Sequence, residues 1–173
     1  MALPKLDTPT YELEQPSTGE KIKYRPFLVK EQKTLMMAQE SGDDAQVRDA
    51  LASLITGCTF DSIDPYKVPI FDVEFLFLRI RGKSVGEKID LSLLCPDDNE
   101  TRVNKSIDLE EIDVNMKVGH TNEIDITDKI KMIMRYPTLN DMTDMNPELA
   151  NSEDVFTMIK RCVQEIRDDE KVY

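Results

Sequence analysis

The chain has no tryptophan, one histidine and only three cysteines among its 173 residues. Any Ser-His-Asp or Cys-His catalytic arrangement would have to use the one histidine, His120. Cys58, Cys95 and Cys162 are odd in number and far apart in the sequence, which favours buried, reduced thiols over a disulfide framework. The sequence therefore holds little material for nucleophilic catalysis.

Positive charge is also scarce, with 22 Lys and Arg residues against 34 Asp and Glu residues and a formal net charge of −12. Such a field repels the phosphate backbone from most directions of approach. No run of basic residues interleaved with aromatic ones offsets it. We therefore expect no nucleic acid partner.

Long apolar runs are absent. No stretch approaches the roughly 20 apolar residues of a membrane span. Residues 1–7 also lack the apolar segment of about 7–15 residues that a signal peptide needs. The sequence predicts a soluble, intracellular protein that neither enters a membrane nor is secreted.

The chain should nevertheless fold, since apolar residues make up 40% and charged residues 32% of it. Its order of strands, helices, strands and a helix predicts an α+β fold rather than a parallel sheet of βαβ units. We expect an α+β domain over 1–145, with a helical block at about 30–82 and a β-hairpin subdomain at about 87–137. A C-terminal helix occupies 146–173.

The N-terminal part predicts a β-hairpin followed by the helical block. Apolar and polar residues alternate on both sides of a Pro-Ser-Thr-Gly turn, which indicates two short strands within 10–28. Helices are expected at about 30–40 and, more clearly, at 47–58, where apolar residues recur at helical spacing. A third helix at 71–80 is apolar on nearly all sides, and we expect Gly82 to break it.

The remainder predicts antiparallel β-hairpins and an amphipathic helix. Alternation at 89–95 indicates a half-buried strand, and a returning strand is expected at 103–109. A further two-stranded unit is expected at 124–136. A stripe at helical spacing then predicts the C-terminal helix. Its members are Val155, Met158, Ile159, Cys162, Val163 and Ile166.

The two most apolar helices are candidate partner-binding elements. A helix that is apolar nearly all round is either central to the fold or part of an interface, and an amphipathic helix must also pack to persist. Burial in the protein's own core remains the alternative for both. The candidate binding residues are Phe71, Phe75, Leu78, Val155, Ile159, Cys162, Val163 and Ile166.

A phosphate-binding loop is suggested by the Gly-Lys-Ser string at 82–84. The motif needs a glycine five residues earlier, where Phe77 stands, and a strand before it with a helix after. We therefore place Lys83 and His120 in exposed loops without a catalytic role.

A zinc knuckle is suggested by the Cys-Pro-Asp-Asp string at 95–98. Asp98 stands where the second cysteine should be, and no other Cys-x-x-Cys or paired histidine completes four ligands. We expect no metal, no cofactor and no enzyme activity. The alternative function is a small metal- or nucleotide-dependent enzyme or regulator that uses Cys95, His120 or Lys83.

Several longer strings are more specific than these short motifs. They lie at 3–6, 10–13, 16–19, 24–31, 75–86, 95–98 and 134–138. Through them the chain resembles the baseplate hub subunit family of T-even-type contractile-tailed phages, especially its marine cyanophage members. Some relatives carry a fuller cysteine knuckle at the position of Cys95 and Asp98, and family members tend to continue beyond Tyr173.

The resemblance implies a part in building the central hub of the tail baseplate, as a subunit or as an assembly factor. The expected partners are other phage hub or tail proteins, and an oligomer remains open. The expected locations are the host cytoplasm during assembly and the tail baseplate of the virion. The resemblance supplies no catalytic residues. A host-type acidic adaptor protein is a third reading.

Overall fold

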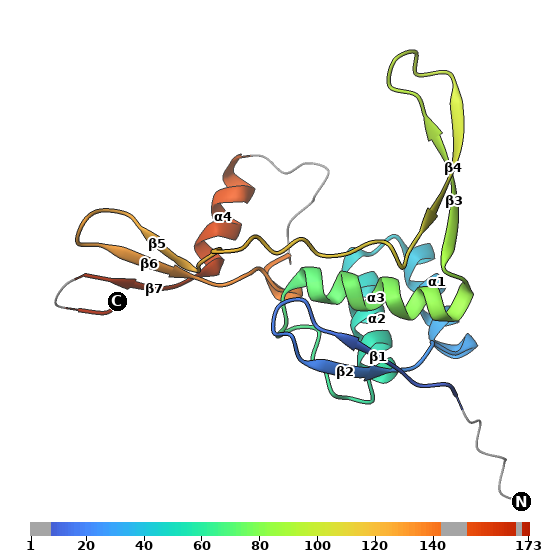
Figure 1. The fold of residues 1–173 in the computed structure, drawn as a ribbon, viewed down its shortest axis with the longest axis horizontal. Helices are drawn as coiled ribbons and strands as arrows, with labels where there is room; N and C mark the ends of the chain where they lie inside the picture. The colour runs from blue at the N-terminus through green and yellow to red at the C-terminus, as the bar shows by residue number, and fades with distance from the viewer. Residues whose placement is uncertain (1–7, 143–151, 169–170) are drawn as a thin grey trace, which may run out of the picture.

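The computed structural model describes residues 8–142, 152–168 and 171–173 (Figure 1). Its helices and strands confirm the predicted α+β class. In chain order they are β1 Tyr11–Glu14, β2 Lys21–Tyr24, α1 Val29–Ser41, α2 Asp44–Cys58, α3 Ile70–Val85, β3 Lys88–Leu94, β4 Arg102–Asp108, β5 Glu123–Asp125, β6 Lys131–Met134, the 3-10 helix η1 Leu139–Met142, α4 Ser152–Cys162 and β7 Val163–Arg167.

The described strands form three small antiparallel sheets, β1-β2, β3-β4 and β5-β6-β7. Figure 1 shows the β1-β2 hairpin against the helices α1 to α3, the β3-β4 pair extending away from one end of α3, and the three-stranded sheet with α4 towards its other end. The predicted N-terminal hairpin and the two later hairpins are therefore confirmed.

The hydrophobic core lies between the β1-β2 hairpin, α2 and α3. The helical stripe predicted at 47–58 supplies much of it, and α3 contributes apolar residues at nearly every turn. The buried core residues are Ile22, Tyr24, Ala52, Leu54, Ile55, Cys58, Val73, Leu76, Ile80 and Leu139. Leu139 comes from η1, so the core also reaches the segment that leads to α4.

The helix α3 is longer than the sequence predicts, because Gly82 lies inside it instead of ending it. A glycine costs about 1 kcal/mol relative to alanine inside a helix, which burial of the surrounding apolar face readily offsets. The helix ends at Gly86, whose φ of 135° is accessible to glycine and strained for other residues. The chain therefore turns into β3 at Gly86.

A buried carboxylate fastens the β1-β2 hairpin to α3. Asp72, in the first turn of α3, is fully buried. Its carboxylate accepts hydrogen bonds from Gln15 Nε2 at 2.7 Å, from the Ser17 backbone N–H at 3.1 Å and from the Ser17 hydroxyl. The positive end of the helix dipole further favours a negative charge there. The hairpin turn is thus held in place by hydrogen bonds to a single side chain.

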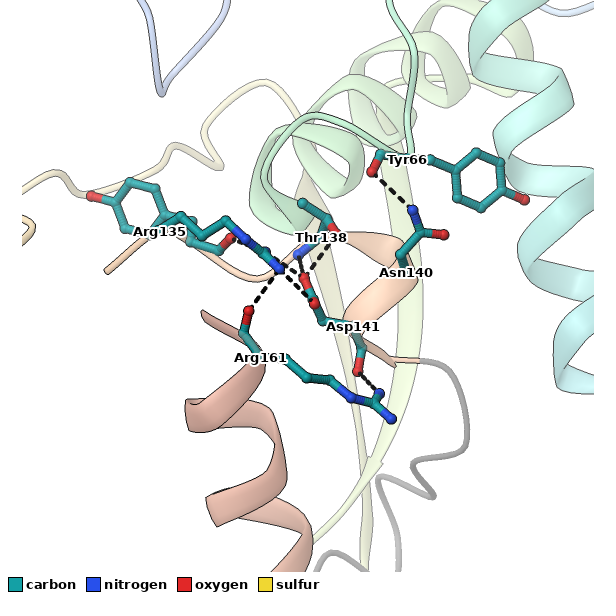
Figure 2. A network of polar contacts seen from close by, with 7 residues as sticks. Tyr66, Arg135, Thr138, Asn140, Asp141 and Arg161 are labelled. Atoms are coloured by element: carbon teal, nitrogen blue, oxygen red, sulfur yellow. Dashed lines mark hydrogen bonds and ion pairs between the residues drawn. The ribbon is translucent and has the colours of Figure 1, made fainter. Parts of the chain in front are cut away.

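A second polar network fastens η1, the segment that follows β6, and α4 to one another (Figure 2). The Arg135 guanidinium donates to both carboxylate oxygens of Asp141, at 2.6 and 2.8 Å. Thr138 donates to the same carboxylate through its backbone N–H and its hydroxyl. Arg135 also donates to the Arg161 carbonyl, and the Arg161 guanidinium donates to the Asp141 carbonyl, each at 2.8 Å. These hydrogen bonds set the position of α4.

The C-terminal end of the predicted helix is a strand, which corrects the prediction of a helix through Ile166. The helix α4 ends at Cys162, and β7 begins at Val163. Ile166 pairs with Met132 of β6, so pairing with a distant strand overrides the local helical periodicity. The backbone groups of Ile166 also exchange hydrogen bonds with those of Tyr173, at 3.2 and 2.8 Å.

Replacing Asp72 with alanine should lower the free energy of unfolding by about 2–3 kcal/mol, because the donors of Gln15 and Ser17 lose a charged acceptor in a buried place. Urea denaturation measures the change. Glu74→Ala, a matched substitution at an exposed position of the same helix, should change the free energy of unfolding by about 0.5 kcal/mol or less. Equal effects of the two substitutions contradict the assigned role of Asp72.

Replacing Asp141 with asparagine should give a destabilisation that depends on pH. Hydrogen bonds from Arg135 lower the pKa of Asp141, despite the opposing effect of burial. The stabilisation is therefore complete above the unfolded-state pKa of about 4 and is lost as the pH falls through the lower folded-state pKa.

The difference in unfolding free energy between wild type and Asp141→Asn should accordingly be about 2 kcal/mol at neutral pH and shrink below about pH 4. Urea denaturation across this pH range measures it. Asp128→Asn, at an exposed loop position, is the control. A difference that stays constant down to pH 2 contradicts the assignment.

Candidate protein-binding surfaces

The strands β3 and β4 form a two-stranded ribbon that projects from the helical body (Figure 1). Directly paired residues of an antiparallel ladder lie on the same face, and successive residues alternate between faces. One face, called the ribbon face below, consists of Ile89, Leu91, Leu93, Val103, Lys105 and Ile107. The opposite face between these positions consists of Asp90, Ser92, Asn104 and Ser106.

The ribbon face is apolar and largely uncovered. Leu91, Leu93 and Val103 are 37%, 45% and 55% exposed, and only Ile89 and Ile107 at the base are half-buried. The predicted half-buried strand is therefore more exposed than expected, because the described part of the chain places no further layer over these residues. A two-stranded hairpin is marginally stable alone in water, which makes an uncovered apolar face costly.

The base of the ribbon is clamped to α3. Arg79 donates to the Leu109 carbonyl at 3.0 Å, and the Leu109 backbone N–H donates to the Glu87 carbonyl at 2.7 Å. Lys83 Nζ lies 2.5 Å from carboxylate oxygens of both Glu87 and Glu110, which together raise the pKa of Lys83. Lys83 lies within α3 and is half-buried, which corrects the prediction of an exposed loop.

The tip of the ribbon is built on Asp98. One oxygen of this carboxylate accepts from the backbone N–H groups of Glu100 and Thr101, each at 3.0 Å, and the other from the Thr101 hydroxyl. These hydrogen bonds lower the pKa of Asp98 to about 2. Cys95 closes the turn by donating its N–H to the Thr101 carbonyl at 2.8 Å. The knuckle-like string at 95–98 thus folds as a hydrogen-bonded turn.

The apolar residues of α4 differ in their exposure. Cys162 is buried and Met158 is half-buried, whereas Val155, Phe156 and Ile159 are exposed, Phe156 to 63%. Partner binding through Val155 and Ile159 stays a prediction. Their exposure makes them available for it.

The three-stranded sheet carries a further apolar row. Ile124, Met132 and Ile166 are paired across β5, β6 and β7, and they share one face. Ile124 and Ile166 are exposed. A hollow of about 660 Å³ adjoins the sheet, with Ile124, Met134 and Tyr136 in its lining. The predicted residue Val163 lies on β7, where it is half-buried.

The candidate residues of α3 are engaged inside the protein. Phe75 is buried, and the Arg79 guanidinium lies over its ring at 4.7 Å from the centroid. Phe71 packs edge-on against Tyr136 with the ring centroids 5.0 Å apart. Leu78 is half-buried. These contacts match the reading of α3 as a core helix, and partner binding through these side chains stays a prediction.

The residues of the alternative enzyme or regulator lie on different elements. Cys95 is at the ribbon tip, Lys83 is in α3, and His120 is in the loop before β5, where its ring stacks on Tyr136 at 5.8 Å. Within the described residues, no three His, Cys, Asp or Glu side chains come together in a way that could hold a metal ion.

Sequence reasoning missed two exposed apolar features. Phe156 lies off the helical stripe that predicts α4, so the spacing does not single it out. The alternation at 89–95 predicts a half-buried strand, whereas Leu91 and Leu93 of the ribbon face are exposed. Alternation alone does not show whether another layer of the fold packs on the apolar face, and a strand added beside a hairpin widens the sheet without covering that face.

One of the comparisons with known proteins gives a match. No helix in the described ranges is long and apolar enough to cross a membrane. Neither the curated proteins nor the solved structures give a match. The family model described as T4 bacteriophage base plate protein matches residues 8–173, which include all three sheets and all the helices above. The chain therefore belongs to the T4 bacteriophage base plate protein family.

Proposed function

We propose that the chain is a subunit of the baseplate hub, or an assembly factor for it, and that it acts by binding other tail proteins. Its family is one of phage baseplate proteins, and the family indicates the tail of the virion as its location. Presence in the host cytoplasm during assembly is part of the proposal. We also propose that the chain has no catalytic activity.

The observation that carries the binding role is the uncovered ribbon face. Its apolar side chains stand on a projecting element whose base is clamped by Arg79 and Lys83, so they are presented in a fixed direction. Apolar patches that a folded protein keeps exposed commonly mark interaction sites. Covering this face with a partner removes the apolar area from water without requiring the body of the protein to rearrange.

The alternative of a metal- or nucleotide-dependent enzyme or regulator gains no support from the geometry. Lys83 forms ion pairs with Glu87 and Glu110. The Asp98 carboxylate accepts hydrogen bonds within the turn at the ribbon tip. His120 lies in a different part of the chain from both.

The ribbon face should be needed for baseplate assembly and not for folding. The triple variant Leu91→Ser, Leu93→Ser and Val103→Thr should keep the thermal unfolding of the wild type, because these side chains are exposed. In host cells infected with phage lacking the gene, this variant should fail to restore baseplates, as counted by sedimentation and electron microscopy of lysates.

The matched control changes the other face of the same ribbon, with Asn104→Ser and Ser106→Thr. It should restore assembly to the wild-type level. Full rescue by the ribbon-face variant contradicts the binding role of this surface. Mass spectrometry of mature virions then separates the two forms of the proposal, since a hub subunit remains in the particle and an assembly factor does not.

A further inference from the structure

We infer that the ribbon face binds a protein partner that presents an apolar strip with lysine or arginine residues at both ends, and not a second copy of this chain. This inference rests on the proposed function, in which the chain works by binding other tail proteins. It adds the chemistry of the partner.

The tip of the ribbon is acidic. Asp97, Asp98 and Glu100 are all exposed there, and the low pKa of Asp98 keeps that group ionised. The nearest basic residue in the sequence is Arg102, whose guanidinium donates to the Ser92 carbonyl at 3.3 Å. The tip therefore carries an excess of negative charge.

The base of the ribbon is acidic as well. It carries four carboxylates, on Glu87, Asp108, Glu110 and Glu111. Lys83 contacts two of them, and Lys88 is paired across the ladder with Asp108. Arg79 also reaches the base, where its guanidinium donates to the Leu109 and Ile112 carbonyls. Three cations against four carboxylates leave the base with a net charge of −1. Over the whole segment 87–111, eight acidic residues face three basic ones.

The two acidic ends are far enough apart for each to attract its own group of charges on a partner. Strands of seven residues place them about 23 Å apart, while the Debye length at physiological salt is about 8 Å. Between them, the only charge on the ribbon face is Lys105, which is paired with Leu91. A complementary surface is therefore basic at both ends and apolar in the middle, with an acceptor oxygen opposite Lys105.

A second copy does not meet this requirement. If two ribbons packed face to face in the same direction, tip would meet tip and base would meet base. In opposite directions, each tip would meet a base. Both arrangements bring like charges together, and the net charge of −12 adds a general repulsion.

Zero-length carbodiimide cross-linking tests this inference, since the reagent joins a carboxylate to a lysine amine only where the two groups touch. The full chain is mixed with each purified tail and baseplate protein of its phage in turn. We expect cross-links from Asp97 or Glu100 to lysines of one of these proteins. A mixture of ¹⁵N-labelled and unlabelled chain detects contacts between copies, and ribbon-to-ribbon cross-links between copies overturn the inference.

Charge reversal provides a second readout on the protein that cross-links. Asp97→Lys with Glu100→Lys should slow association about tenfold at low salt and weaken its dependence on ionic strength. Glu20→Lys with Glu40→Lys makes the same change in net charge at exposed positions away from the ribbon, and should have a much smaller effect. Surface plasmon resonance measures both.

The outcomes distinguish a failure of this inference from a failure of the proposed function. Binding that is lost in the ribbon-face variant but unchanged by charge reversal overturns the basic ends of the partner and leaves the proposed function standing. Binding that survives the ribbon-face variant overturns this docking surface. If deletion of the gene leaves baseplate assembly normal, the proposed function itself fails.

Discussion

The packing of α3 between the hairpin β1-β2 and α2 is the constraint on which the rest of the structure depends. Val73, Leu76 and Ile80 are completely buried along this helix, which fixes both its axis and its rotation. The ribbon leaves from its C-terminal end at Gly86, and the Ile70 backbone N–H at its other end donates to the Pro137 carbonyl at 2.9 Å. A helix of 16 residues is about 24 Å long, so α3 sets the distance between the ribbon and the three-stranded sheet.

The fold was predictable from the sequence wherever one periodicity was unambiguous. The stripe from Val47 to Cys58 gave α2 correctly, because no strand could display that spacing. The segment from Val163 to Ile166 continues the helical stripe of α4 but also alternates, and its conformation is decided by pairing with β6, which a local pattern does not contain. Gly82 is predicted to end α3 because glycine has a low helix propensity. Its burial inside the helix outweighs that propensity, and the sequence does not show the burial.

The sequence predicts that the candidate binding surface is apolar, but it does not predict that this surface is exposed to solvent. Leu91 and Leu93 lie on one side of the predicted strand, yet the alternation does not show whether another layer of the fold packs on that side. Phe75 shows the converse ambiguity, because an apolar helix can equally be an interface or part of the core. Partner binding through Phe75 therefore stays a prediction. Lys83 lies in α3 only because the helix extends past Gly82. The ion pair of Lys83 with Glu110 was therefore not predictable from the sequence either.

The turn at the ribbon tip takes its shape from an ionised carboxylate. With a pKa of about 2, Asp98 keeps its hydrogen bonds to Glu100 and Thr101 in all but strongly acidic water. A tip formed through these oxygen atoms therefore keeps the same contour from neutral to moderately acidic surroundings.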